Sequence, residues 1–112
     1  MTNLEYSIEK SLLSTILFAH HQKEDENYFN TLELKEETFK NQFHRLVAKQ
    51  INHNRALGLS VQEEFITEAM AQNGTLTNQM LEIMTANPFS RHLFQRYYGS
   101  LKKVSLKSHW DI

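Results

Sequence analysis

Apolar residues recur along most of the chain at the three- and four-residue spacing of an α-helix. The clearest case opens the chain, at Leu4, Ile8, Leu12, Leu13, Ile16 and Leu17. A stripe with this period lies on one face of a helix, so it predicts a first helix of about four turns with one buried side. Ser7, Lys10 and Ser11 fall off the stripe and are expected to face water.

The next segments predict helices of different strength. The acidic run 23–26 suits the start of a short second helix, whose apolar residues are Tyr28, Phe29 and Leu32. A single turn is expected at 36–39. A stronger helix at about 41–55 is predicted by the spacing of Phe43, Leu46, Val47 and Ile51.

Glycines and capping residues divide the second half of the chain. Gly58 ends the preceding helix, and residues 60–63, Ser-Val-Gln-Glu, fit the capping-box pattern that opens the next one. That helix carries Phe65, Ile66, Ala69 and Met70. Gly74 is expected to close it in the left-handed conformation.

Two further helices are predicted after Gly74. Thr77 is expected to cap a short helix that stops near Asn87, because Pro88 disfavours helical geometry in the residue before it. Its apolar residues are Met80, Leu81 and Met84. Ser90 is expected to cap the last helix, with a stripe of Leu93, Phe94, Tyr97, Tyr98, Leu101 and Val104 interrupted by Gly99.

These patterns predict an all-α fold, a compact bundle of about six helices. Three Gly and one Pro in 112 residues leave long stretches without helix breakers, and runs of β-branched residues are nearly absent. A hydrophobic content of 40% is enough for a packed core. We expect a single domain over residues 1–112, with a globule at about 3–104 and a short tail at 105–112.

Composition excludes several classes of site. Without cysteine the chain has no disulfide framework, thiolate zinc site, iron–sulfur cluster or thiol nucleophile. No apolar run approaches the ~20 residues needed to span a bilayer, so no membrane partner is expected. The acidic start around Glu5 lacks the basic region of a secretory signal, which favours a cytoplasmic location.

The candidate catalytic groups do not form a recognisable motif. Six histidines are present, at 20, 21, 44, 53, 92 and 109, and only His20 and Glu24, one turn apart, have metal-ligand spacing. No glycine-rich phosphate loop is present. Carboxylates occur in runs, and no pair stands out as an acid and base in an apolar setting. We therefore expect no catalytic residue, metal or cofactor.

Charge is unevenly distributed along the sequence. Residues 1–40 hold eight acids and four bases, whereas residues 83–112 hold one acid and five bases. The five bases are Arg91, Arg96, Lys102, Lys103 and Lys107. With aromatic residues between them they are candidates for contacts to a nucleic acid. The alternative, which we favour, is that the aromatic residues pack inward and the bases are simply solvated.

Several short motifs follow one another in a recognisable order. They are Glu9-Lys10-Ser11-Leu12-Leu13-Ser14-Thr15-Ile16-Leu17, Leu34-Lys35-Glu36-Glu37-Thr38-Phe39, His44-Arg45-Leu46-Val47 with Ile51, Ala56-Leu57-Gly58-Leu59-Ser60, Gly74-Thr75-Leu76 with Leu81, and Asn87-Pro88-Phe89-Ser90 leading to Tyr97 or Tyr98. Over residues 3 to about 103 this series resembles the N-terminal domain of DnaB-type replicative helicases. Ser14 and Ser60 depart from a glycine and an aspartate common in that family.

The resemblance implies a non-catalytic interaction domain of the DNA replication machinery. Its expected partners are replicative helicase subunits, primase or a helicase loader, with a weak homodimer possible and nucleic acid secondary. An exposed apolar patch is expected on the last helix, at Phe89, Phe94, Tyr98 and Leu101, or on the outer side of the first helix.

The resemblance leaves two origins open. In the family a helical hairpin, a linker and an ATPase domain follow this globule, whereas this sequence stops at Ile112. It is therefore either an excised domain, or a phage or plasmid protein that copies the domain to engage a host helicase or primase. A small helical nucleic-acid-binding protein is the alternative from another functional class.

Overall fold

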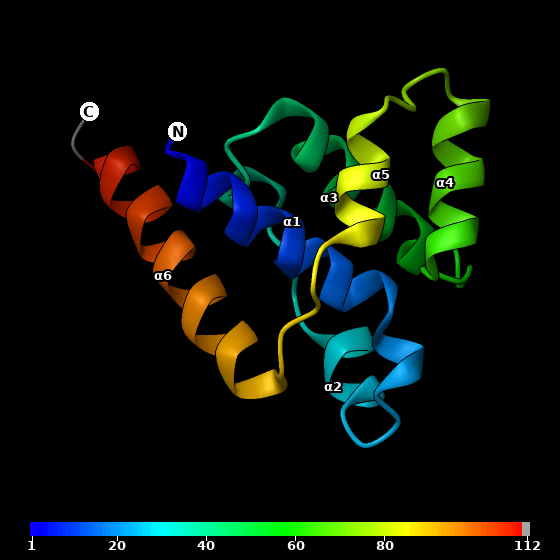
Figure 1. Cartoon of the computed structure of the whole chain (residues 1–112), viewed down its shortest axis with the longest axis horizontal. Coiled ribbons are helices and arrows are strands. Elements are labelled where there is room, and N and C mark those ends of the chain that lie inside the picture. The colour runs from blue at the N-terminus through cyan, green and yellow to red at the C-terminus, as the bar shows by residue number, and fades with distance from the viewer. Residues whose placement is uncertain (111–112) are drawn as a thin grey trace.

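Helix α1 (Asn3–Leu17) runs through the middle of the molecule, and the other helices surround it (Figure 1). In the computed structural model, which describes the backbone of residues 1–110 and the side chains of residues 1–103, α1 contacts α5, α3, α6 and α2. Thr2 caps this helix, since its hydroxyl accepts from the Glu5 N–H while the Glu5 carboxylate accepts from the Thr2 N–H. The predicted first helix is confirmed, although Leu4 of its apolar stripe is exposed.

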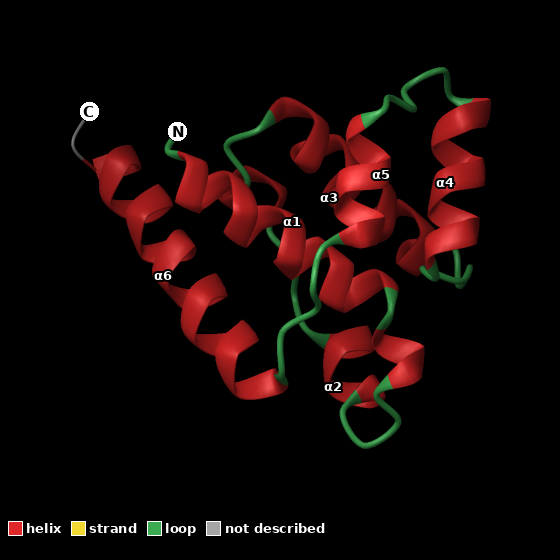
Figure 2. Cartoon of the chain, in the orientation of Figure 1, coloured by secondary structure: helices red, strands yellow, loops and turns green. Residues whose placement is uncertain are grey.

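The described chain is helical throughout and contains no strand (Figure 2). After α1 its helices are α2 (Glu26–Thr31), α3 (Gln42–Ala56), α4 (Glu63–Gln72), α5 (Gln79–Thr85) and α6 (Arg91–Trp110), with 3-10 turns η1 (Ala19–His21) and η2 (Glu36–Thr38). The predicted all-α class and the six helices are therefore confirmed. Helix α6 extends past position 104, where the predicted globule ends, and residues 111–112 lie outside the described chain.

Two glycines end their helices as the sequence predicted. Gly58 and Gly74 have φ of 70° and 73°, which other residues rarely adopt. After α3, the N–H of Leu59 reaches back to the Asn54 carbonyl at 2.8 Å. After α4, the N–H of Thr75 reaches the Met70 carbonyl at 2.9 Å. Both ends have the paired hydrogen bonds of a Schellman motif, so the last carbonyls of each helix are satisfied.

The predicted start of α4 is wrong by a few residues. Ser60 was expected to cap this helix, but α4 begins at Glu63 with Gln62 as an extended cap residue. The side-chain amide of Asn54 donates to the Ser60 carbonyl at 2.9 Å, and the Ser60 hydroxyl accepts from the Gln62 N–H at 3.2 Å. These contacts tie the segment to the end of α3 and keep it extended. The four-residue capping pattern at 60–63 does not include Asn54 and so could not reveal this contact.

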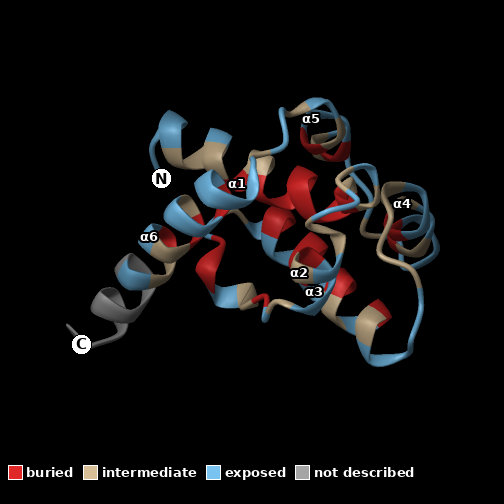
Figure 3. Ribbon diagram, turned by 90° about the horizontal axis from the view of Figure 1, so that it is seen from below, coloured by how far each residue is buried: buried red, intermediate tan, exposed pale blue. Residues whose placement is uncertain are grey.

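The core fills the space enclosed by α1, α3 and the inner side of α6 (Figure 3). Phe29 of α2 and Phe94 of α6 meet edge to face with ring centroids 5.2 Å apart. Such aromatic pairs contribute beyond the area they bury. The largest fully buried side chains come from all six helices and the segment before α3: Phe29, Phe39, Phe94, Leu12, Leu13, Ile16, Leu17, Ile51, Ile66, Met70, Ile83 and His44.

No helix in the described part of the chain combines the length and the apolar character that crossing a bilayer requires.

Candidate functional site

Three of the four residues predicted to line an exposed docking patch are buried. Phe94, Tyr98 and Leu101 are 0%, 6% and 8% exposed, and all belong to the core. The Tyr98 hydroxyl accepts from the Lys35 N–H at 2.8 Å and donates to the Glu33 carbonyl at 3.2 Å, which ties α6 to the chain before η2. This corrects the expectation of a patch at these residues: the same helical stripe that made them conspicuous is the one that α6 buries.

Phe89, the fourth candidate, is half-buried beside the start of α6. Its ring stacks on Tyr97 with centroids 5.0 Å apart, and its N–H donates to the Thr15 hydroxyl at 2.7 Å. Phe89 is therefore partly accessible, but it also fixes the chain that leads into α6 to helix α1.

Two of the basic candidates of α6 contact an acidic or aromatic side chain, and two others form no ion pair within the described chain. Arg91 lies 3.6 Å from an oxygen of Asp25 and 4.3 Å from the ring centre of Tyr28. Lys102 lies over the ring of Tyr98 at 5.2 Å. Arg91 thus joins α6 to α2 and its N-cap residue, whereas the contact of Lys102 with Tyr98 lies within α6 itself.

Arg96 and Lys103 are the free members of the set. Both are exposed, and neither forms an ion pair with a described acidic residue. They lie seven positions apart on α6, with His92 one turn before Arg96, so they form one short line along the solvent face. The side chains of Lys107 and Val104 lie outside the described part of the chain, so their predicted roles stay predictions.

An apolar groove lies instead between α4 and α5. It encloses about 260 Å³, and its apolar lining is Leu76, Met80, Leu81 and Met84, facing Thr67 of α4. Met84 also lines a second hollow of about 340 Å³ that continues to Phe18, Ala86 and Pro88. We call these two hollows, which share Met84 as a lining residue, the α4–α5 groove. Sequence periodicity missed it because it counted the exposed Leu81 as part of a buried stripe.

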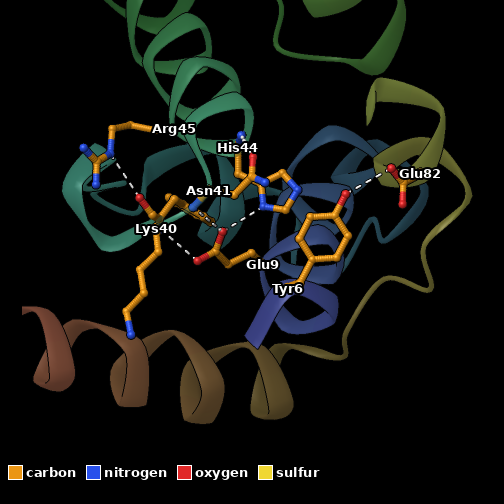
Figure 4. Close-up of polar contacts among 8 residues, drawn as sticks. Tyr6, Glu9, Lys40, Asn41, His44, Arg45 and Glu82 are labelled. Carbon is orange, nitrogen blue, oxygen red and sulfur yellow. Dashed lines mark hydrogen bonds and ion pairs between the residues drawn. The ribbon is translucent and has the colours of Figure 1, made fainter. Parts of the chain in front are cut away.

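A buried polar cluster joins α1 to α3 (Figure 4). The side chains of Glu9 and His44 are both fully buried, and Oε1 of Glu9 lies 2.7 Å from Nδ1 of His44. The other carboxylate oxygen accepts from the Lys40 N–H at 2.8 Å, and Oε1 also accepts from Asn41 at 3.3 Å. Both oxygens of the Glu9 carboxyl are therefore hydrogen-bonded, as buried polar groups require.

Tyr6 closes the cluster on its remaining side. Its ring stacks on the His44 ring at 5.0 Å, and its hydroxyl donates to Glu82 of α5 at 3.0 Å. Burial, followed by the Glu82 carboxylate, raises the pKa of Tyr6. One residue from α1 thus contacts both α3 and α5.

Glu9 and His44 are an acid and a base in an apolar setting, although no such pair stood out in the sequence. Glu9 is four positions before Leu13, and His44 is three before Val47, so each interrupts an apolar stripe at a core position. That placement was the available signal. Because both side chains are closed to solvent, the pair is out of reach of a substrate in this conformation, and its contacts are those of a structural tie.

A polar hollow of about 420 Å³ lies between the end of α1, helix α2 and the connection from α3 to α4. Arg55 lines it and donates to the carbonyls of Leu32 and Phe29, which caps the C-terminal end of α2. Burial lowers the pKa of Arg55. Here His20 faces Glu63 at 3.7 Å, rather than the Glu24 that its sequence spacing indicated.

These groups do not assemble into a metal site. Across the described residues, no three His, Cys, Asp or Glu side chains converge in a way that could hold a metal ion. His109 lies where side chains are not described. The two terminal nitrogens of Arg55 donate to backbone carbonyls, whereas its buried Nε has no hydrogen-bond partner among the described residues.

Fold and surface together define a class, a small all-α domain with a hydrophobic core, a buried polar cluster and an open apolar groove. Neither a protein-family model, a curated protein nor a solved structure matches the chain.

Proposed function

We propose that this chain is a non-catalytic protein-interaction domain of the DNA replication machinery, similar to the N-terminal domain of DnaB-type replicative helicases. Its partners would be helicase subunits, primase or a helicase loader. The proposal rests on the ordered sequence motifs and on where their residues meet in the fold.

The observation that carries the proposal is the set of contacts that α1 makes with two other motif segments. Glu9 of the first motif contacts His44, which opens the motif His44-Arg45-Leu46-Val47. Thr15 of the first motif accepts from the N–H of Phe89 in the last motif. Residues that recur in a family pattern are expected to form such contacts between segments, because these contacts fix the relative positions of the helices.

The accessible apolar groove supports an interaction role. Its lining residues Leu76 and Leu81 are exposed although both are large and apolar. Apolar hollows of this kind on a small domain mark sites where another molecule docks.

Calorimetric titration with the helicase, the primase and the loader of the organism that encodes the chain tests this proposal. We expect saturable binding to at least one of the three. Helicase lacking its own N-terminal domain is the matched control for contacts to the motor. If none of the three binds a folded sample, the replication function is refuted. Light scattering on the same sample should show a monomer or a weak dimer.

A nucleic-acid-binding function is the second candidate, and the line formed by His92, Arg96 and Lys103 favours it. Single-stranded and duplex DNA should be titrated at several salt concentrations, because phosphate contacts are strongest at low salt. Under this alternative, Arg96→Gln weakens binding and lowers its salt dependence, whereas Gln95→Ala on the same helix does not. Absence of binding at low salt removes this candidate.

A further inference from the structure

The exposed apolar residues of this chain are concentrated where it carries only negative charge. Between Arg55 and Arg91 the sequence has four glutamates and no Lys, Arg or His. Five of the nine large hydrophobic residues that are exposed in the described chain lie in that stretch: Leu57, Leu59, Phe65, Leu76 and Leu81. The hollow between α4 and α5 lies within this stretch, whereas the second hollow of the groove is completed by Phe18 and His21 from the end of α1 and the turn after it. A surface with these two properties is complementary to a partner that is both apolar and basic.

We propose that the α4–α5 groove binds an amphipathic helix of a partner protein whose apolar face is flanked by Lys and Arg. This inference rests on the proposed function as an interaction domain and names the chemistry of the partner. Apolar side chains of the partner helix enter the two hollows that meet at Met84, and its basic side chains lie beside the glutamates of α4.

Two of those glutamates are free to meet a partner. Glu64 is exposed, lies one turn before Thr67 of the groove, and has no hydrogen bond or ion pair with another described residue. Glu68 accepts only a 3.5 Å hydrogen bond from Gln72. Glu82 of α5, in contrast, already meets Tyr6 and Lys10, at 3.0 and 3.7 Å.

The walls of the groove determine the form of its occupant. The first hollow lies between helices α4 and α5, whose backbone groups are used internally, and no strand lines either hollow in the described chain, so neither offers a strand edge to an extended peptide. A helix presents apolar side chains at intervals of three and four residues, which suits two hollows that share a lining residue.

A second copy of this chain fits the groove less well. Its basic helix α6 carries Arg96 and Lys103 on the solvent face, but among its described residues Leu93 is the one exposed large apolar side chain. Helix α6 would therefore supply positive charge without the apolar stripe that fills the groove.

Fluorescence anisotropy with a synthetic peptide of about 18 residues, or about five helical turns, tests the inference. The peptide carries a leucine stripe at helical spacing flanked by lysines. One control has the same composition in scrambled order, and a second keeps the leucine stripe but replaces Lys by Glu. We expect the first peptide to bind the intact chain about tenfold or more tightly than either control.

Variants of the chain then locate the binding site. Leu81→Ser should weaken binding of the basic peptide by about tenfold, the effect of losing an apolar anchor. Leu57→Ser is the matched control, because Leu57 is 60% exposed and Leu81 64%, and Leu57 lines neither hollow. Glu64→Gln should weaken binding and reduce its salt dependence, while Glu24→Gln should not.

Three outcomes overturn the inference: equal binding of the scrambled peptide, an unchanged affinity in Leu81→Ser, or self-association of the chain that Leu81→Ser abolishes. The last result would assign the groove to a second copy. Failure here is distinguishable from failure of the proposed function. Replication proteins that bind Leu81→Ser normally refute the groove alone, whereas peptide binding without binding of any replication protein refutes the replication role alone.

Discussion

The carboxylate of Glu9 and the imidazole of His44 lie 2.7 Å apart with both side chains fully buried. The first residue belongs to α1 and the second to α3, so the contact joins two helices across the core. A buried ion pair is weak evidence of added stability, but removal of one partner leaves the other uncompensated. Replacement of either member of the pair alone should therefore markedly lower the free energy of unfolding.

Glu9→Ala should lower the free energy of unfolding by about 3–5 kcal/mol, because His44 and two backbone N–H groups lose their buried acceptor. His44→Ala should also be strongly destabilising. The double variant should cost less than the sum, with a coupling free energy of about 1–3 kcal/mol. Urea unfolding followed by circular dichroism measures all three.

Glu24→Ala is the control for the loss of a carboxylate at an exposed site, and it should change stability by less than about 0.5 kcal/mol. Additive effects of Glu9→Ala and His44→Ala would contradict the role assigned to their contact.

Acid stability depends on Glu5 at the start of α1. The hydrogen bond from Lys40 Nζ at 2.7 Å, together with that from the Thr2 N–H, lowers the pKa of Glu5 from 4.5 to about 2. Because the folded-state pKa is lowered, the contribution of this carboxylate to stability is present above pH 4.5 and is lost as the pH falls through about 2.

Urea unfolding at a series of pH values between these limits checks this sign. Relative to the intact chain, Glu5→Gln should be less stable at pH 5, and the difference should shrink toward pH 2. Lys40→Met should reproduce part of the effect, since it removes the first cause of the lowered pKa. A difference that stays constant with pH would refute the assignment.

Tyr98→Phe should cost about 1–3 kcal/mol of stability, because the N–H of Lys35 loses a partly buried acceptor while the ring remains. Burial raises the pKa of Tyr98, so its contribution is present below pH 10 and is lost as the pH rises through the higher folded-state value. The variant should therefore lose less stability above pH 10 than the intact chain.

Tyr97→Phe is the neighbouring control, since no hydrogen bond of its hydroxyl is found and its ring contact with Phe89 is retained. Equal losses for the two variants would mean that the Tyr98 hydroxyl contributes nothing specific.

The glycines predict stability changes of opposite sign. Gly58→Ala and Gly74→Ala should each destabilise by about 1 kcal/mol, because φ near +70° is unfavourable with a Cβ although nothing lies within 4 Å of it. Gly99→Ala should stabilise by about 0.5–1 kcal/mol, because Gly99 lies inside α6 and its Cβ position is also open. Thermal unfolding measures the three shifts, and a common sign would contradict this reading of the backbone.

The sequence predicted local structure well wherever the determining contacts are local. The helices, the ends of α3 and α4 at Gly58 and Gly74, and the Ser90 cap of α6 depend on residues within a few positions of one another. The start of α4 was misplaced because the Asn54 side chain holds Ser60 from the preceding helix.

What the sequence by itself determined was therefore an all-α chain, its helix stripes and its uneven charge. Only the tertiary structure decided which member of each stripe is covered. Phe94 became core whereas Leu81 stayed accessible, and Glu9 met His44 across 35 positions of sequence. Periodicity specifies which face of a helix is apolar. Burial and pairing depend on which other element covers that face, and contacts between segments far apart in the sequence determine the covering element.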